Sequence, residues 1–205
     1  MHVVLAVVVL FVLATGAHAQ SYGPPTYSVG DTWTRSTGSD VREAKVVKVE
    51  DGGTWFTGGR RDCPTCLSLL DRNLALIRLA DAEGKDVDVT SMLFVPLGAD
   101  WRLFDFPLEV DKAWRFAARA YFKGVQLPYQ VNCKVVAYED VKTPAGTFKA
   151  FRVRRDWSFK PIAGGSSEIR WYEESWFAPD VKNVVKYAST GRNAEEWVLQ
   201  SYSLK

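Results

Sequence analysis

Histidine is almost absent from this 205-residue chain, whose two histidines are His2 and His18. Both precede Ala19, the last residue of the signal peptide that the sequence predicts, so the mature chain would contain no imidazole. Imidazole is the side chain that titrates near neutral pH without perturbation. Its absence excludes Ser-His-Asp and Cys-His catalysis and transition-metal sites that depend on histidine. Because three cysteines are also few for a cysteine-only zinc site, we expect no catalytic residues, no metal and no cofactor.

The chain also has few long apolar runs, and the longest is at its start. An apolar run from Val3 to Ala14 precedes the small-x-small triplet Ala17-His18-Ala19, which is the pattern of a signal peptidase site. We therefore expect residues 1–19 to be a signal peptide and the protein to be periplasmic or secreted. The run is shorter than the roughly 20 residues of a membrane-spanning helix, and no later run is as long. We expect no integral membrane segment in the mature chain.

Neither sign of charge dominates, with 26 Lys and Arg against 24 Asp and Glu. This balance lacks the electrostatic signature of a nucleic-acid-binding protein or of a protein held on a membrane by charge. The partners left open are a lipid-like small molecule and another protein of the cell envelope.

Helical periodicity is scarce, whereas apolar residues alternate with polar ones over much of the chain. Residues 20–26 predict an extended linker because Pro24 and Pro25 suit neither a helix nor a central strand. Residues 27–205 predict a single β-rich domain. The predicted strands are Val41–Glu50, Thr54–Thr57, Leu74–Leu79, Val125–Tyr138, Phe148–Phe159, Ile169–Phe177, Val184–Ser189 and Glu196–Tyr202. Glycine-containing turns between them indicate an antiparallel meander, and one short helical turn is expected around Pro107–Ala118.

Aromatic residues occur on both faces of the predicted strand Ile169–Phe177, with Trp171 on one face and Trp176 on the other. Such a sheet is either covered on both sides or curved around an interior. We therefore expect an all-β, mainly antiparallel fold, either a curved sheet or half-barrel or a two-layer sandwich, with little helix. A weak repeat between Val29–Trp33 and Val110–Trp114, each followed by a long strand, is compatible with a pseudo-duplicated domain.

Cys63-Pro64-Thr65-Cys66 has the spacing of a thiol-disulfide oxidoreductase. In thioredoxin-like enzymes this motif begins a helix, which lowers the pKa of the first thiol. A strand and not a helix is expected downstream here, so a structural disulfide in an oxidising compartment is the favoured interpretation. A redox-active pair stays open, because the neighbouring Arg60 and Arg61 would favour a thiolate. Cys133 is interpreted as a buried apolar residue, with an intermolecular disulfide as the alternative.

Eight tryptophans are many for one domain, and core packing accounts for most of them. In a curved sheet some would line a cavity for an apolar ligand. The candidate cavity-lining residues are Trp33, Trp114, Trp157, Trp171, Trp176 and Trp197. Exposed, coplanar tryptophans would instead indicate a carbohydrate-binding module.

Adjacent carboxylates such as Glu173 and Glu174 point to opposite faces of a strand, so one such pair cannot serve a glycosidase as both acid and base. A cross-strand pair, Glu174 with Glu196, stays open.

The segment Val141–Phe151 contains the turn motif Pro144-Ala145-Gly146-Thr147-Phe148, and Trp176-Phe177-Ala178-Pro179 follows it. In these motifs the chain resembles, from about Tyr27 to its end, a broad group of uncharacterised exported bacterial β-rich proteins. The role of the turn is structural: Pro144 fixes φ, Gly146 can take a positive φ, and Phe148 enters the core.

The resemblance implies a curved antiparallel sheet, broadly similar to the half-barrels of envelope lipoprotein carriers, and it implies no activity. We therefore expect an exported, non-catalytic binding or scaffold protein that could hold a lipid-like ligand. A thiol-disulfide oxidoreductase using Cys63 and Cys66 and a carbohydrate-binding module remain as alternatives.

Overall fold

The structure is a computed structural model that describes residues 20–60, 63–89, 97–122, 125–160, 167–191 and 194–205. Within these ranges nearly all regular structure is antiparallel β, no α-helix is present, and a 3-10 turn covers Pro179–Val181. The predicted fold class is confirmed. In the part of the chain that the structure describes, no helix has the length and apolar character needed to cross a membrane.

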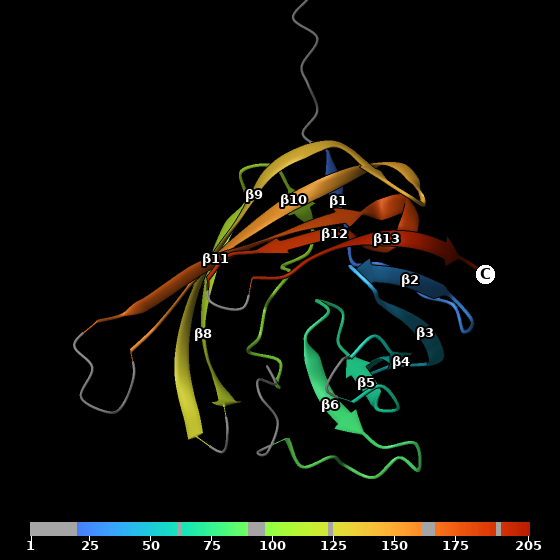
Figure 1. The fold of residues 1–205 in the computed structure, drawn as a ribbon, viewed down its shortest axis with the longest axis horizontal. Helices are drawn as coiled ribbons and strands as arrows, with labels where there is room; N and C mark the ends of the chain where they lie inside the picture. Colours follow the sequence, from blue (N-terminus) through green and yellow to red (C-terminus); the bar gives the residue numbers. More distant parts are fainter. Residues whose placement is uncertain (1–19, 61–62, 90–96, 123–124, 161–166, 192–193) are drawn as a thin grey trace, which may run out of the picture.

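One large sheet of eleven strands dominates the fold (Figure 1). Its strands are β2 (Thr32–Thr37), β3 (Asp40–Glu50), β4 (Gly53–Gly58), β5 (Leu67–Leu70), β6 (Leu76–Ala80), β8 (Ala113–Phe122), β9 (Val125–Thr143), β10 (Gly146–Phe159), β11 (Ile169–Ala178), β12 (Asn183–Ser189) and β13 (Glu196–Ser203). Their order across the sheet is β6-β5-β4-β3-β2-β13-β12-β11-β10-β9-β8. Two short strands, β1 (Ser21–Tyr22) and β7 (Leu108–Glu109), pair with each other and form a second small sheet.

The large sheet consists of two meanders, β2 to β6 and β8 to β13, which are joined where β2 pairs with β13. The sheet is strongly curved but does not close into a barrel, so β6 and β8 are its two edges. Beside the join, the buried carboxylate of Asp31 accepts hydrogen bonds from the backbone N–H of Lys205 at 2.8 Å and of Ser28 at 2.9 Å. β2 and β13 are the first and last strands of the large sheet in chain order, and they are therefore fixed to each other at its centre.

The hollow of the curved sheet is filled by residues 101–108, which run between the two halves of the sheet (Figure 1). Trp101 is only 1% exposed and contacts the rings of Phe116 and Trp157. Further along, Phe104 and Phe106 both pack on Phe177 of β11. We call residues 101–108 the inner strap.

A second apolar cluster lies where the end of the β9–β10 hairpin packs on β12 and β13. Tyr27, Trp33 and Phe56 contact one another through their rings, and Phe148 of the hairpin belongs to the same cluster. The apolar core of the sheet is therefore divided into separate clusters.

The helical turn expected around Pro107–Ala118 is wrong, because this stretch contains β7 and the start of β8. Trp114 and Phe116 are half-buried on the inner face of β8, whereas Arg115 and Ala117 are exposed on the other face. Alanine and arginine are good helix formers, and their propensity concealed this alternation. The segment forms a strand because it pairs with β9.

The weak internal repeat corresponds to a repeated local structure. At the first copy, the N–H of Val46 donates to the carbonyl of Asp31, and Thr32 pairs with Lys45. At the second copy, the N–H of Val135 donates to the carbonyl of Lys112, and Ala113 pairs with Lys134. Each meander therefore opens with the same loop and the same register.

Candidate binding site on the inner face of the sheet

Charged and aromatic side chains form a row across the inner face of the sheet, the face that surrounds the inner strap. The row consists of Arg42 on β3, Arg35 on β2, Trp197 on β13, Tyr187 on β12, Glu173 on β11 and Arg155 on β10. The strand register pairs Arg35 with Arg42, Tyr187 with Trp197, and Arg155 with Glu173. We call this row the inner belt.

The Arg155 end of the inner belt is buried beneath the inner strap. The side chain of Arg155 is 4% exposed, and its Nε lies 3.5 Å from Oε2 of Glu173. The same guanidinium donates hydrogen bonds to the carbonyl of Leu103 at 3.2 Å and to the hydroxyl of Ser175. It also lies 5.5 Å from the ring of Phe104. A buried charge therefore fixes the backbone of the inner strap.

The middle of the inner belt is aromatic. The rings of Tyr187 and Trp197 stack at 5.9 Å with an interplanar angle of 17°. Burial raises the pKa of the Tyr187 hydroxyl, and the nearby Glu173 carboxylate raises this pKa further. The hydroxyl is therefore protonated at neutral pH. On the other side, the guanidinium of Arg35 lies 4.7 Å from the ring centre of Trp197.

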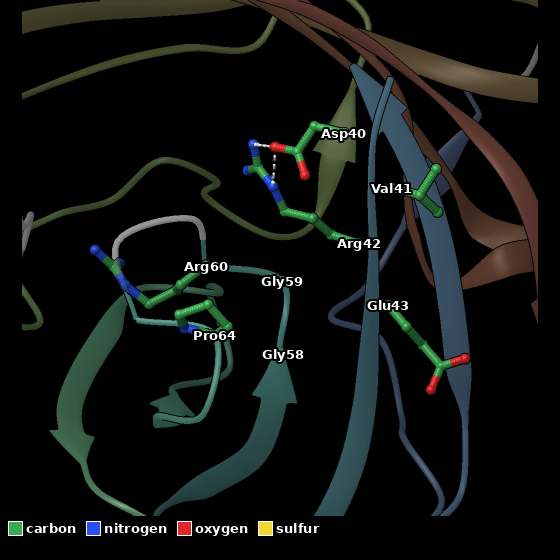
Figure 2. A pocket seen from close by; sticks show the side chains of 8 residues that line it. All are labelled: Asp40, Val41, Arg42, Glu43, Gly58, Gly59, Arg60 and Pro64. Carbon is green, nitrogen blue, oxygen red and sulfur yellow. Dashed lines mark hydrogen bonds and ion pairs between the residues drawn. The ribbon is translucent and has the colours of Figure 1, made fainter. Parts of the chain in front are cut away.

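The Arg42 end of the inner belt opens into a pocket of about 270 Å³ between the start of β3 and the loop that follows β4. Its lining residues are Asp40, Val41, Arg42, Glu43, Gly58, Gly59, Arg60 and Pro64. Figure 2 shows the side chains of Arg42 and Arg60 on one side of β3, whereas those of Val41 and Glu43 point to the other side. We call this site the rim pocket.

The arginines at the rim pocket are held by the protein itself. Arg42 donates through Nε and Nη2 to Asp40 (Figure 2), and its Nη2 lies 3.9 Å from Oε1 of Glu195. Arg35 on β2 donates to the carbonyl of Gly59, which lines the pocket. Burial and the neighbouring positive charge of Arg42 lower the pKa of Arg35. Charges of both signs therefore meet at the pocket, since Asp40 and Glu43 line it together with Arg42 and Arg60.

Gly58 lines the rim pocket at a point where β4 lies very close to β3. Its φ is +69°, and a Cβ at this position would collide with the backbone carbonyl oxygen of Glu43 on β3. The next residue, Gly59, also has a positive φ, of +76°. Only glycine fits at Gly58 without displacing β3, so the end of β4 lies close against β3.

The predicted disulfide between Cys63 and Cys66 is present, with Cα atoms 5.4 Å apart. It spans the turn before β5, so no helix begins at the motif as it would in a thioredoxin-like enzyme. Cys66 is 1% exposed and packs in a small cluster with Leu76 and Leu79. The disulfide thus fixes the chain directly beside Pro64, which lines the rim pocket.

Cys133 is a free thiol on β9, paired with Arg155 on one side and with Trp114 on the other. It is 3% exposed. Burial raises the pKa of the thiol to about 12, although the positive charge of Arg155 lowers it. The thiol is therefore protonated at neutral pH and is not accessible for a disulfide between two chains.

The six tryptophans predicted to line a cavity occupy three places. Trp33 and Trp176 belong to the cluster around Tyr27. Trp114, Trp157 and Trp171 surround the inner strap, and the rings of Trp157 and Trp171 stack at 5.4 Å. Trp197 belongs to the inner belt. All eight tryptophans of the chain are buried or half-buried, and their contact with a ligand stays a prediction.

The other predicted residues have structural surroundings. Gly146 has a φ of +138° after the Pro144–Ala145 turn, and Phe148 is buried against the ring of Tyr202 at 5.7 Å. Glu174 and Glu196 do not meet.

Ala188 of β12 pairs with both glutamates, so they are separated by two strand spacings, about 10 Å. Each has its own cation, Arg152 for Glu174 at 4.0 Å and Lys186 for Glu196 at 3.4 Å. Among the residues that the structure describes, no three His, Cys, Asp or Glu side chains are grouped as metal ligands.

The part of the chain that matches a known protein family includes only one half of this site. Residues 123–203 match the DUF3108-like family. The DUF3108-like region therefore contains the buried half of the inner belt, from Arg155 and Glu173 to Trp197. Arg35, Arg42 and the rim pocket lie outside the DUF3108-like region, in the N-terminal meander.

Three solved structures are similar to this chain over most of its length. A candidate lipoprotein from Parabacteroides distasonis ATCC 8503 shares 15% identity, with 90% of this chain and 100% of that chain covered and a TM-score of 0.49. A candidate exported protein with a YmcC-like fold from Bacteroides fragilis NCTC 9343 shares 16%, with the same coverage and a TM-score of 0.43. The hypothetical lipoprotein YmcC from Escherichia coli K12 shares 7%, with 86% of each chain covered and a TM-score of 0.48. No curated protein matches the chain significantly.

Proposed function

We propose that this chain is an exported, non-catalytic binding protein whose ligand binds at the open end of the inner belt. The inner belt is the observation that supports this function. Charges such as Arg155 and Glu173 are costly in an interior, and natural sequences accept such costs mainly at functional sites. The inner belt joins this buried pair to the open rim pocket through Tyr187 and Trp197.

The filled hollow disfavours a lipid-like ligand in the interior of the sheet. Trp101, Phe104 and Phe106 occupy the space that an acyl chain would need, and their neighbours are aromatic side chains of the sheet. A lipid-like ligand would have to displace the inner strap together with the hydrogen bond between Arg155 and Leu103. The rim pocket is open without such a rearrangement.

The surroundings of the cysteines support a structural role over thiol-disulfide exchange. Exchange requires a thiolate with access to its substrate. No helix begins at Cys63 to favour its thiolate, because the motif forms a turn that leads directly into β5. We expect the Cys63–Cys66 disulfide to have a reduction potential below about −300 mV, as structural disulfides of exported proteins do. Rapid exchange with glutathione would support the oxidoreductase instead.

The predicted signal peptide, residues 1–19, supports export. N-terminal sequencing of the protein recovered from the periplasm or medium should begin at Gln20. Uncut protein retained in the cytoplasm would contradict this part of the proposal.

Native mass spectrometry of the protein purified from its own cell envelope tests the binding function. We expect a mass above that of the bare chain, from a retained small molecule. A bare monomer that takes up nothing from an envelope extract would contradict the proposal. A retained acyl lipid, with faster hydrogen exchange in the inner strap, would move the site from the rim pocket to the hollow.

A further inference from the structure

β6 and β8 are the two edges of the large sheet (Figure 1), and they differ in what lies beside them. Beside β6 the chain turns back, and the N–H of Val87 donates to the carbonyl of Leu79. An isolated bridge joins Ala80 to Asp86 at the same place. No segment of the described chain pairs with β8 on the side away from β9. We call this side of β8 the open edge.

The backbone groups at the open edge belong to every second residue of β8. The carbonyl of Lys112, just before β8, accepts a hydrogen bond from the N–H of Val135 on β9, and the same register continues along both strands. Bonded and non-bonded pairs alternate in an antiparallel ladder, so the even-numbered residues of β8 bond to β9. The odd-numbered residues therefore point their N–H and C=O groups to the open edge. They include Ala113, Arg115, Ala117 and Arg119.

Pro128 on β9 supports this assignment. It pairs with Arg119 of β8, and proline has no N–H to donate. A non-bonded pair needs no donor between the two strands, whereas a bonded pair would lack one here. On its other side, Pro128 precedes Gln130, which is the first residue of β9 that pairs with β10.

The outer face of the open edge carries positive charge. Arg115 and Arg119 are both exposed there. The residue opposite Arg115 is Asn132 of β9, which is uncharged. The next residue across the sheet, Asp156 of β10, is ion-paired with Arg154 at 2.9 Å. The open edge therefore offers positive charge to a strand placed beside it.

The inner face of β8 is apolar. Trp114, Phe116 and Ala118 are half-buried and pack in the cluster around the inner strap. Because β8 is an edge, these side chains have a neighbouring strand on one side only. Apolar side chains of an added strand would cover the other side.

We propose that the open edge of β8 binds an extended segment of another protein by strand addition, and that acidic residues alternate with apolar ones in this segment. Main-chain hydrogen bonds supply affinity in this mode of binding, and alternate side chains supply specificity. The acidic residues would lie beside Arg115, and the apolar ones beside Trp114 and Phe116. The inference adds a protein partner and is independent of the ligand proposed for the inner belt.

A second copy of this chain fits the open edge poorly. Two β8 strands paired with each other would bring the exposed arginines of both copies onto one face of a continuous sheet. Like charges on neighbouring strands are destabilising, and charged residues at an edge protect against self-association. Analytical ultracentrifugation should show a monomer, and a dimer that pairs through β8 would overturn the choice of partner.

Hydrogen exchange measured by NMR tests whether the edge is open. In the free protein, the amides of Arg115 and Ala117 should exchange at least about tenfold faster than those of Phe116 and Ala118, which bond to β9. Slow exchange at all four amides would show that the chain covers its own edge, and this would overturn the inference.

A peptide of about eight residues that alternates glutamate and valine is the probe for binding. Its binding should saturate, should slow the exchange of the Arg115 and Ala117 amides, and should be about tenfold tighter than that of a lysine-valine peptide of equal length. Binding that fails to saturate, or that leaves these amides unprotected, would overturn strand addition.

Proline variants separate strand addition from loss of the fold. Ala117→Pro removes a donor at the open edge without breaking a bond to β9, so peptide binding should weaken at least about tenfold while the denaturation midpoint changes little. Ala118→Pro is the matched control, since it removes a donor to β9 and should lower the midpoint clearly. Equal midpoints for the two variants would contradict the assigned open edge.

Charge variants test the preference for acidic residues. Arg115→Glu should weaken binding of the glutamate-valine peptide about tenfold and strengthen binding of the lysine-valine peptide. Arg170→Glu makes the same change at a side chain of β11 that is 76% exposed, and it should leave binding of both peptides unchanged. Equal effects of the two variants would show general attraction of charge and would overturn the acidic partner.

Discussion

Nε of Arg155 on β10 lies 3.5 Å from Oε2 of Glu173 on β11, inside the curved sheet and beneath the inner strap. A buried ion pair adds little more to the stability of the fold than an apolar pair would, but loss of one partner leaves an uncompensated buried charge. The pair therefore makes the interior sensitive to changes that a surface would tolerate.

Glu173→Gln should lower the free energy of unfolding by about 3–5 kcal/mol, because Arg155 would lose its counter-charge. The adjacent Glu174 is a matched control. It lies on the other face of β11 and pairs with Arg152 at 4.0 Å, so Glu174→Gln should cost less than about 1 kcal/mol. Chemical denaturation measures both values. Equal effects would show that the Arg155–Glu173 pair is not energetically buried.

Trp101→Ala should destabilise the fold by about 3–5 kcal/mol, because the indole fills the hollow against Phe116 and Trp157. Leu97→Ala is the control: Leu97 lies just before the inner strap but is 37% exposed, so its loss should cost less than about 1 kcal/mol. Thermal and denaturant unfolding compare the two. A cost for Trp101→Ala as small as that of the control would mean that the inner strap does not belong to the core.

The Cys133 thiol should make the fold sensitive to alkali. Its pKa rises from 9.0 to about 12 on burial, so between these values the native state binds more protons than the unfolded state. The free energy of unfolding should then fall with rising pH, by about 1.4 kcal/mol per pH unit from this group.

Cys133→Ala removes the titrating group and should reduce the alkaline slope by that amount, although the absolute stability also drops through the cavity. Denaturation between pH 9 and pH 11 gives both slopes. Parallel slopes for the two proteins would contradict the raised pKa.

Gly58→Ala should both destabilise the fold and disturb the rim pocket, because the new Cβ would meet the carbonyl of Glu43. Gly38→Ala separates this collision from backbone strain: Gly38 also has a positive φ, +57°, but has open space around it. We expect about 1–2 kcal/mol for Gly38→Ala and at least about 2 kcal/mol more for Gly58→Ala. Similar losses would mean that the end of β4 moves freely away from β3.

Much of the C-terminal meander could be predicted from local pattern. The strand predicted over Val184–Ser189 became β12 (Asn183–Ser189), because alternation and turn residues fix its limits without help from distant parts. β8 could not be found in this way, since Ala117 and Arg119 favour a helix when considered alone. β5 was missed because only four residues separate the disulfide turn from the turn that follows β5.

The candidate site was less predictable than the fold. Arg155 falls in the series Phe151, Val153, Arg155, Trp157, and the alternation after Val153 places it on the apolar face, which is a signal that the sequence contains. Its partner was not readable, because the register between β10 and β11 depends on pairing across a loop. The position of the inner strap was equally hidden, since Trp101 and Phe104 show that a segment is buried but not what it fills.

The pairing of β2 with β13 has a consequence for synthesis. β3 pairs with one edge of β2, but the other edge finds its partner only in residues 196–203, so the two meanders cannot be joined until nearly the whole chain has emerged. Contacts between such distant residues slow folding, because a long loop is closed before any pairing is gained. The N-terminal and C-terminal meanders therefore stay unjoined until the last strand, β13, is available to pair with β2.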